Sequence, residues 1–377
     1  MMLTRREFIK GTLSAGVVLG STAMFNGCTD ATRQALPDFQ DTTIPVAGLD
    51  NTALTLLYHA SLAPSGHNSQ PWRVRIESAD SWIIEADAER RLPCVDPLNR
   101  ELMLSLGTFI ENLSLAAGAF GLGTDIRVIA RDRHDQEVVR VAFHKDKPTD
   151  YPLQRIKKRR TVKLGHLPRE ITATDVNILS GGMKGQVFYF PRGSNHAACI
   201  RDLAVENFRV QASRDEAQQE LVRWLRLKPR EAKLHRDGLS TEGMEIRGVK
   251  GWFVRQFVQP RDFLKETYRQ QGVDLTAELA QQGGGWVVIT SPGQTVADLI
   301  DTGRRFERMA LLAREHGIAI HPMTQVLEEK QGIEQIAGSH DNGFYPQFVL
   351  RVGYIDTYPE PVSLRRPVDW FVTTEEN

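Results

Sequence analysis

The 377-residue chain has only three cysteines, Cys28, Cys94 and Cys199, and no excess of charge of either sign. Three cysteines cannot build a disulfide framework, and none lies in a CxxC pair or a Cys/His cluster, which excludes knottin-like scaffolds and zinc ribbons. The 47 basic and 47 acidic residues cancel. This balance argues against broad nucleic-acid binding, which needs a positive excess. With 41% apolar and 25% charged residues, the composition is that of a soluble globular protein with a sizeable core.

Several catalytic fingerprints are also missing. The sequence contains no HExxH, GxSxG or GxxxxGK[ST] motif, and no GxGxxG in a strand–helix context. Its ten histidines are scattered without ligand spacing, so we predict no metal site and no haem. Cys94 carries no signal of activation and Cys199 is predicted to lie in the core, which argues against cysteine nucleophile chemistry.

The N-terminus resembles a targeting signal. Residues 4–10, TRREFIK, resemble a twin-arginine export signal, and a weakly apolar stretch follows from Gly11 to Thr29. We therefore expect residues 1–27 to be read by the twin-arginine export machinery, leaving the protein periplasmic or membrane-anchored on the outer side of the cytoplasmic membrane. Cys28 follows FNG, which resembles a lipoprotein cleavage box. A lipid anchor at Cys28, plain cleavage and an uncleaved tether all stay open, and the polar residues 28–50 are predicted to be a tether.

Apolar spacing predicts the first elements of the folded part. A helix is expected from about Asn51 to Ser61, and strands around 74–76 and 82–84. The strongest helical pattern runs from about Arg100 to Phe120 and ends at Gly121, before a predicted strand at 125–129.

An internal similarity links this helix to residues near 300. At a constant offset of 196, matching residues are Gly107 with Gly303, Glu111 with Glu307, Leu115 with Leu311, Ala117 with Ala313, and Gly121 with Gly317. Any two amphipathic helices that end in glycine share part of this pattern, but the shared Glu and Gly positions go further. We predict two similar halves, 51–150 and 151–377, fused as an intramolecular pseudo-dimer around one core. The second half carries a charged insertion at 209–270, either a lid over a site or a surface elaboration.

Four segments could carry chemistry. PSGHNSQPW at 64–72 is a loop that contains two prolines and is rich in hydrogen-bonding groups. These groups either bind the edge of a planar heteroaromatic ring or bond one another in a rigid connecting loop. KKRRTVK at 157–163 is either a solvated basic run or a phosphate site. GIAIHPMTQ at 317–325 begins as a buried strand and turns at Pro322. In PQFVLRVGY, at 346–354, Arg351 is charged inside an apolar strand and is expected to meet an anion.

Together these segments resemble the nitroreductase superfamily of FMN-dependent oxidoreductases, over about residues 50–365. PSGHNSQPW is similar to the family's flavin-contacting loop, KRRTVK to its phosphate-binding start, and LRVGY to its C-terminal strand. In ordinary members the phosphate motif precedes the QPW loop, whereas here QPW at 70–72 precedes RRT at 159–161. This inverted order resembles the double-length, Acg-type branch, and it implies one FMN per chain.

The resemblance implies roles for individual residues. The residues that would bind phosphate and ribityl are Arg159, Arg160, Thr161, Lys163 and Arg351; those that would line the flavin ring are Ser65, His67, Asn68 and Gln70; and those that would lie against a ring face and the N5 side are Pro322, Met323 and Thr324. The implied fold is an α+β, nitroreductase-like fold. No motif demands an acid or a base, so no catalytic residue is named.

The implied function is that of an exported FMN-dependent oxidoreductase that passes electrons through flavin to a small electron-poor acceptor. Its electron donor is unknown, because NAD(P)H is not expected outside the cytoplasm. That difficulty favours an alternative, a protein that binds and sequesters FMN without turnover.

Overall fold

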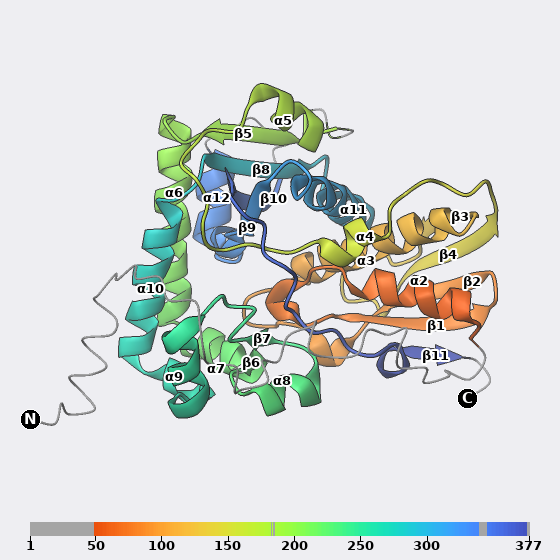
Figure 1. Cartoon of the computed structure of the whole chain (residues 1–377), viewed down its shortest axis with the longest axis horizontal. Coiled ribbons are helices and arrows are strands. Elements are labelled where there is room, and N and C mark those ends of the chain that lie inside the picture. Colours follow the sequence, from red (N-terminus) through yellow and green to blue (C-terminus); the bar gives the residue numbers. More distant parts are fainter. Residues whose placement is uncertain (1–48, 182, 184, 339–344, 375–377) are drawn as a thin grey trace, which may run out of the picture.

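The computed structural model describes residues 49–181, 183, 185–338 and 345–374. The predicted export signal, residues 28–48 of the tether and the Cys28 cleavage box lie outside the described residues. The described part is a mixed α+β fold with two main β-sheets, helices packed between them, and a helical block at one side (Figure 1).

The first main sheet has the strand order β11-β1-β2-β4-β3. Its strands are β1 (Trp72–Ser78), β2 (Ser81–Ala86), β3 (Leu122–Val128), β4 (Glu137–Lys145) and β11 (Val372–Thr374). Helices α2 (Asn51–Ser61) and α3 (Arg100–Ala119) belong with this sheet. The predicted helices and strands of this region are confirmed, because each has the apolar period of its element.

The second main sheet has the order β5-β8-β10-β9, with all neighbours antiparallel. Its strands are β5 (Val187–Pro191), β8 (Gly285–Ser291), β9 (Ile318–Pro322) and β10 (Tyr345–Tyr354). The helices around it are α4 (Gln154–Lys158), α5 (Ala173–Leu179), α11 (Val296–Ala313) and α12 (Lys330–Gly338). Every residue of β8 is buried, which explains its nearly continuous apolar sequence.

Helices α3 and α11 cross at two glycines. A Cβ atom built on Gly107 would lie 2.3 Å from the Ile300 carbonyl oxygen, and one built on Gly303 would lie 2.1 Å from the Leu104 carbonyl oxygen. Leu104 and Ile300 are themselves separated by the same offset of 196 (300 − 104). The contact is therefore the reciprocal one that a two-fold relation between the halves would produce, although the duplication itself stays a prediction.

Helix α3 is the one helix of the described segments that is long and apolar enough to cross a bilayer. Most of it is buried in the main core instead, with Leu106, Phe109, Ile110 and Leu113 fully covered. Its apolar character follows from its place in the main core, which residues of both main sheets share.

The end of the chain does not follow the predicted division at residue 150. Strand β11 pairs in parallel with β1, with Val372 opposite Val74, so the last strand joins the first half's sheet. Cys199 is also placed differently from the prediction, because it is exposed on a helix and not in the core.

The predicted insertion 209–270 lies within a mostly helical block of the chain, residues 195–280. This block consists of α6 (Asn195–Ser213), α7 (Asp215–Trp224), α8 (Pro229–His235), α9 (Gly248–Phe257) and α10 (Glu266–Ala280), with a short parallel pair β6 (Leu225–Arg226) and β7 (Leu239–Ser240). Helices α6 and α10 run side by side (Figure 1). The block has its own small core around Leu225, Leu227 and Val258.

Candidate functional site: a buried anion-binding cluster

The basic side chains of Arg160, Lys163 and Arg351 gather where β10 lies beside β9. Arg351 is opposite His321 in the strand register. The segment that follows α4 runs along the same strand, since the Val162 amide donates to the Ile320 carbonyl at 3.2 Å. The sheet therefore brings together residues that are almost 190 positions apart in the chain.

Arg351 is completely buried yet incompletely bonded. One terminal nitrogen donates to the Lys163 carbonyl at 2.6 Å and lies 3.0 Å from His321 Nδ1. Its Nε and Nη1 have no hydrogen-bond partner among the described residues. Burial lowers the pKa of Arg351 to about 10, against the opposing effect of Glu245. A buried guanidinium with two free donors is costly unless an anion meets it, which fits a phosphate group here.

Glu245, from the insertion, supplies a carboxylate to the same cluster. Its Oε1 accepts from Arg160 Nη2 at 2.7 Å, and its Oε2 accepts from the backbone amides of Lys163 at 3.1 Å and Leu164 at 2.9 Å. Arg160 also donates to the Glu360 carbonyl. One guanidinium and two consecutive amides thus surround an anion, which is how proteins hold phosphate as well as carboxylate.

Three histidines near the cluster are held neutral. Burial and then the Arg351 charge lower the pKa of His166 to about 3, and burial followed by Arg351 lowers the pKa of His321 well below its usual value. Burial and then Lys163 lower the pKa of His67 to about 4. The charge of Lys163 acts on His67, so the QPW loop lies within electrostatic reach of the basic motif.

The loop that carries His67 has an unusual backbone. His67, Asn68 and Gln70 all have positive φ angles, of 51°, 52° and 54°. Such angles cost free energy in non-glycine residues and persist only where the surroundings impose them. The loop is therefore held in its shape by its contacts.

Those contacts use the polar atoms that the family resemblance assigns to flavin. Ser65 Oγ accepts from the Gln70 amide at 2.9 Å. The Asn68 side chain donates to Gly238 and Leu364 and accepts from Arg365. Of these bonds, only the Ser65–Gln70 bond lies within the loop, as the alternative of a self-bonded rigid connection expects, whereas the Asn68 bonds reach other segments of the fold.

Gln70 is fully buried and likewise committed to the protein. Its Nε2 donates to the Arg236 carbonyl at 2.9 Å, and its Oε1 accepts from the Arg366 amide at 2.9 Å. The Arg366 guanidinium donates to the carbonyls of Gln70 and Trp72, both at 2.7 Å. The loop is thus clamped between the insertion and the C-terminal segment.

The remaining predicted residues are dispersed around the cluster. Arg159 is buried and points elsewhere, with its Nε 3.4 Å from Glu307 Oε1 at the α3–α11 core. Met323 packs in the core of the second half, while Pro322 and Thr324 are half-buried at the end of β9. Thr161, which follows Arg160 in the chain, is half-buried.

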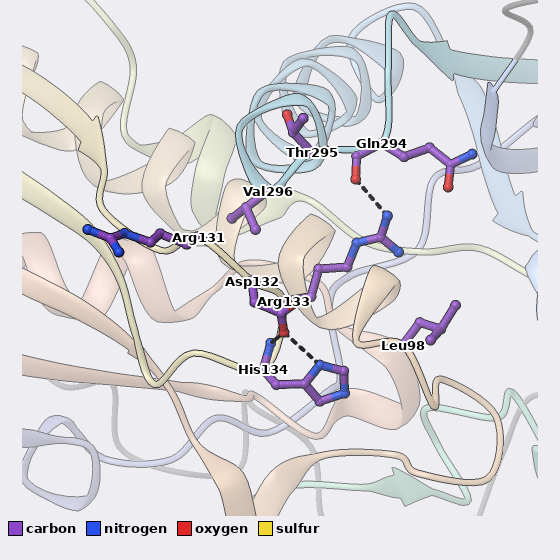
Figure 2. Close-up of a pocket in the computed structure, with 8 residues that line it drawn as sticks. All are labelled: Leu98, Arg131, Asp132, Arg133, His134, Gln294, Thr295 and Val296. Atoms are coloured by element: carbon purple, nitrogen blue, oxygen red, sulfur yellow. Dashed lines mark hydrogen bonds and ion pairs between the residues drawn. The ribbon is translucent and has the colours of Figure 1, made fainter.

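A cavity of about 320 Å³ lies away from these residues (Figure 2). It is lined by residues 131–134, by Leu98 and by the start of α11 at 294–296. The α11 N-terminus is already capped by Thr295 and Asp298, and Arg133 donates to the Gln294 carbonyl at 2.6 Å. We therefore place the candidate site at the cluster and not in this cavity.

Sequence reasoning missed Glu245, His166 and the Arg365–Arg366 pair. Glu245 lies three residues after Glu242 in a loop-rich stretch, and neither gives a local signal of an anion site. Arg365 and Arg366 stand directly before Pro367, and a pair of arginines outside any charge run could have been noticed.

Comparisons with known proteins support a nitroreductase-like oxidoreductase at low identity. The chain is 21% identical to a probable NAD(P)H nitroreductase, PigM, of Serratia sp., over 78% of this chain and 86% of that protein. It is 24% identical to a putative NAD(P)H nitroreductase of Mycobacterium tuberculosis, over 90% of this chain and 95% of the relative. An uncharacterized protein of the same species is also 24% identical, over 82% of this chain and 89% of that protein.

No family model matches the chain. The crystal structure of a nitroreductase-like family protein from Bacillus cereus aligns with a TM-score of 0.35 and 13% identity, covering 61% of this chain and 99% of that one. Nitroreductases use flavin cofactors in general.

Proposed function

We propose that the protein is an FMN-dependent, nitroreductase-like oxidoreductase whose FMN phosphate is held by Arg160, Lys163 and Arg351. The observation that carries the proposal is the fully buried Arg351 with two unpartnered donors beside two other cations. The FMN phosphate is a buried dianion with several acceptor oxygens, which such donors require.

The residues around the cluster have defined tasks in this proposal. Arg351 and Arg160 bind and orient the phosphate, and the amides of Lys163 and Leu164 hold the Glu245 carboxylate beside it. Neutral His166 and His321 leave the cationic charge of the cluster to Arg and Lys side chains. A bound flavin would accept electrons from a donor and pass them to a small electron-poor acceptor.

Storage of FMN without turnover is the second candidate. It is favoured by the insertion, which contacts the QPW loop through residues 236–238 and the basic motif through Glu245. We further propose export by the twin-arginine route, which would separate the protein from cytoplasmic NAD(P)H.

The test is ligand preference in the purified protein. Wild-type protein should bind FMN more tightly than riboflavin, because only FMN has a phosphate. Arg351→Met keeps the side-chain volume, removes the charge, and should abolish this preference. Arg140→Met is the matched control, since Arg140 pairs with Glu77 at the surface of the first sheet and should keep the preference.

Equal binding of FMN and riboflavin by the wild type, or an unchanged FMN preference in Arg351→Met, would contradict the phosphate assignment. Turnover is tested separately, by reduction with dithionite or NAD(P)H in the presence of a nitroaromatic acceptor. Bound flavin that is reduced but never reoxidised by acceptors would favour storage.

A further inference from the structure

Helix α9 exposes an apolar face. Val249, Trp252 and Phe257, here called the α9 face, are 73%, 47% and 46% exposed. At 100° per residue these three positions fall within about 140° of the helix circumference. The Trp252 and Phe257 rings pack against each other with centroids 5.6 Å apart, so the face is preformed. Large exposed aromatic side chains that adjoin one another are uncommon on a monomer without a binding role.

The stretch of sequence that contains this face is rich in exposed basic side chains. Between residues 223 and 261 the exposed charged side chains are the basic Arg223, Lys228, Arg230, Arg247, Lys250 and Arg261 and the acidic Glu231 alone. The other acids of this stretch, Asp237, Glu242 and Glu245, are each paired with arginine. Of these, Arg247 stands at the start of α9, Lys250 lies on it and Arg261 follows it, and no acidic side chain is exposed between residues 232 and 261.

We propose that the α9 face binds reversibly to the surface of an anionic lipid bilayer. Tryptophan and phenylalanine enter the headgroup–acyl boundary, and nearby lysine and arginine are attracted to anionic lipids. The charge excess favours this occupant over a second copy of the chain, because two copies of the face would bring like charges together. The inference does not depend on flavin binding.

The length of α9 limits the mode of contact. The helix has 10 residues, too few to cross a bilayer, and Phe253 and Val254, at about 40° and 140° around the helix from Val249, attach it to the small core of the insertion. The helix therefore lies along the membrane surface, and its binding should weaken as salt screens the charges.

The experiment is sedimentation of the full-length chain with vesicles of phosphatidylglycerol and phosphatidylcholine in equal parts, or of phosphatidylcholine alone. Wild-type protein should partition more strongly onto the anionic vesicles, less so as salt is raised. Trp252→Ser with Phe257→Ser should reduce that partitioning ~10-fold or more, because both anchors are removed. Trp370→Ser, an equally exposed tryptophan in another part of the fold, should leave it unchanged.

The apolar stretch near the N-terminus is common to all these variants, so it does not affect their comparison. Equal partitioning of the wild type and the double variant would overturn the proposal. So would light scattering that shows a wild-type dimer, made monomeric by Trp252→Ser with Phe257→Ser, without any preference for anionic vesicles.

Discussion

Glu245 and Arg160 form a buried ion pair in the cluster where the sequence predicts a phosphate, with Glu245 Oε1 2.7 Å from Arg160 Nη2. The second carboxylate oxygen accepts from two consecutive backbone amides. The chain thus provides its own anion, the Glu245 carboxylate. An incoming phosphate would have to displace this carboxylate from Arg160 or bind Arg160 together with it.

Replacing Glu245 with Gln should therefore destabilise the ligand-free protein and strengthen anion binding. Removing one partner of a buried pair typically costs ~3–5 kcal/mol. The released donors should raise the affinity for inorganic phosphate by ~10-fold or more, a change of about 1.4 kcal/mol. Thermal unfolding with and without phosphate measures both effects.

The matched control is Glu242→Gln, three residues away, whose carboxylate pairs with Arg255 outside the cluster. It should leave phosphate binding unchanged. If Glu245→Gln binds phosphate no better than the wild type, Glu245 does not occupy the anion position in solution.

The α3–α11 crossing should not tolerate any side chain at its two glycines. Gly107→Ala and Gly303→Ala each place a methyl group within 2.3 Å of a backbone carbonyl oxygen, so each should lower the free energy of unfolding by ~3 kcal/mol or more. Gly272→Ala in α10 meets only ordinary contacts, the nearest at 3.5 Å, and should stabilise by up to ~1 kcal/mol. Chemical denaturation compares the three, and near-equal midpoints would show that the helices do not cross this closely.

Neutral His166 and His67 should each make stability fall as the pH drops below about 6.5. The unfolded chain protonates histidine near pH 6.5, whereas folded His166 and His67 have pKa values of about 3 and about 4. For His166 alone this difference costs about 2 kcal/mol at pH 5. Burial raises the pKa of Glu307 to about 7, and this acts oppositely, with stability lost as pH rises from 4.5 to 7. Burial likewise raises the pKa of Asp96 to about 7 and that of Glu328 well above its usual value, so three carboxyl groups oppose the three histidines. The contribution of His166 is therefore the difference between the wild type and a variant that lacks this histidine.

Denaturation midpoints between pH 7.5 and 5 test this dependence. His166→Leu should gain stability relative to the wild type as the pH falls from 7.5 to 5, by about 2 kcal/mol, and His134→Ala, at an exposed histidine, should not. A profile that is the same in His166→Leu and the wild type would contradict the neutral state of His166.

Gln70→Leu separates a structural role from a flavin-contacting one. It leaves the Arg366 amide and the Arg236 carbonyl without partners, which should cost ~2–5 kcal/mol. The preference for FMN over riboflavin should persist, because the phosphate cluster is unaltered. Loss of flavin affinity at unchanged stability would instead favour direct contact with the ring. Gln256→Leu, at an exposed position, is the control.

Local patterns predicted the elements of the folded part well. The α3 helix and strand β10 follow their apolar periods, and the burial of Arg351 follows from a single charge inside an apolar strand. The glycines at offset 196 also marked the positions where α3 and α11 meet. In these cases the physical cause lies within one segment or in a repeat of it.

Long-range pairing limited the prediction of the site. Arg159 and Arg160 are neighbours in one basic run, yet one faces Glu307 and the other Glu245. Which carboxylate each arginine meets depends on how α11 and the insertion pack, and no local pattern encodes that. The same holds for Gln70, whose partners lie 166 and 296 positions away.

The pairing of β11 with β1 has a consequence for the order of folding during synthesis. Val74 and Val372 are 298 positions apart (372 − 74). At ~5–20 residues per second, the edge of β1 waits about 15–60 s for its partner. The first main sheet begins to form early in synthesis, yet it is among the last parts of the fold to be completed. A truncation of only six residues at the C-terminus would leave this sheet one strand short.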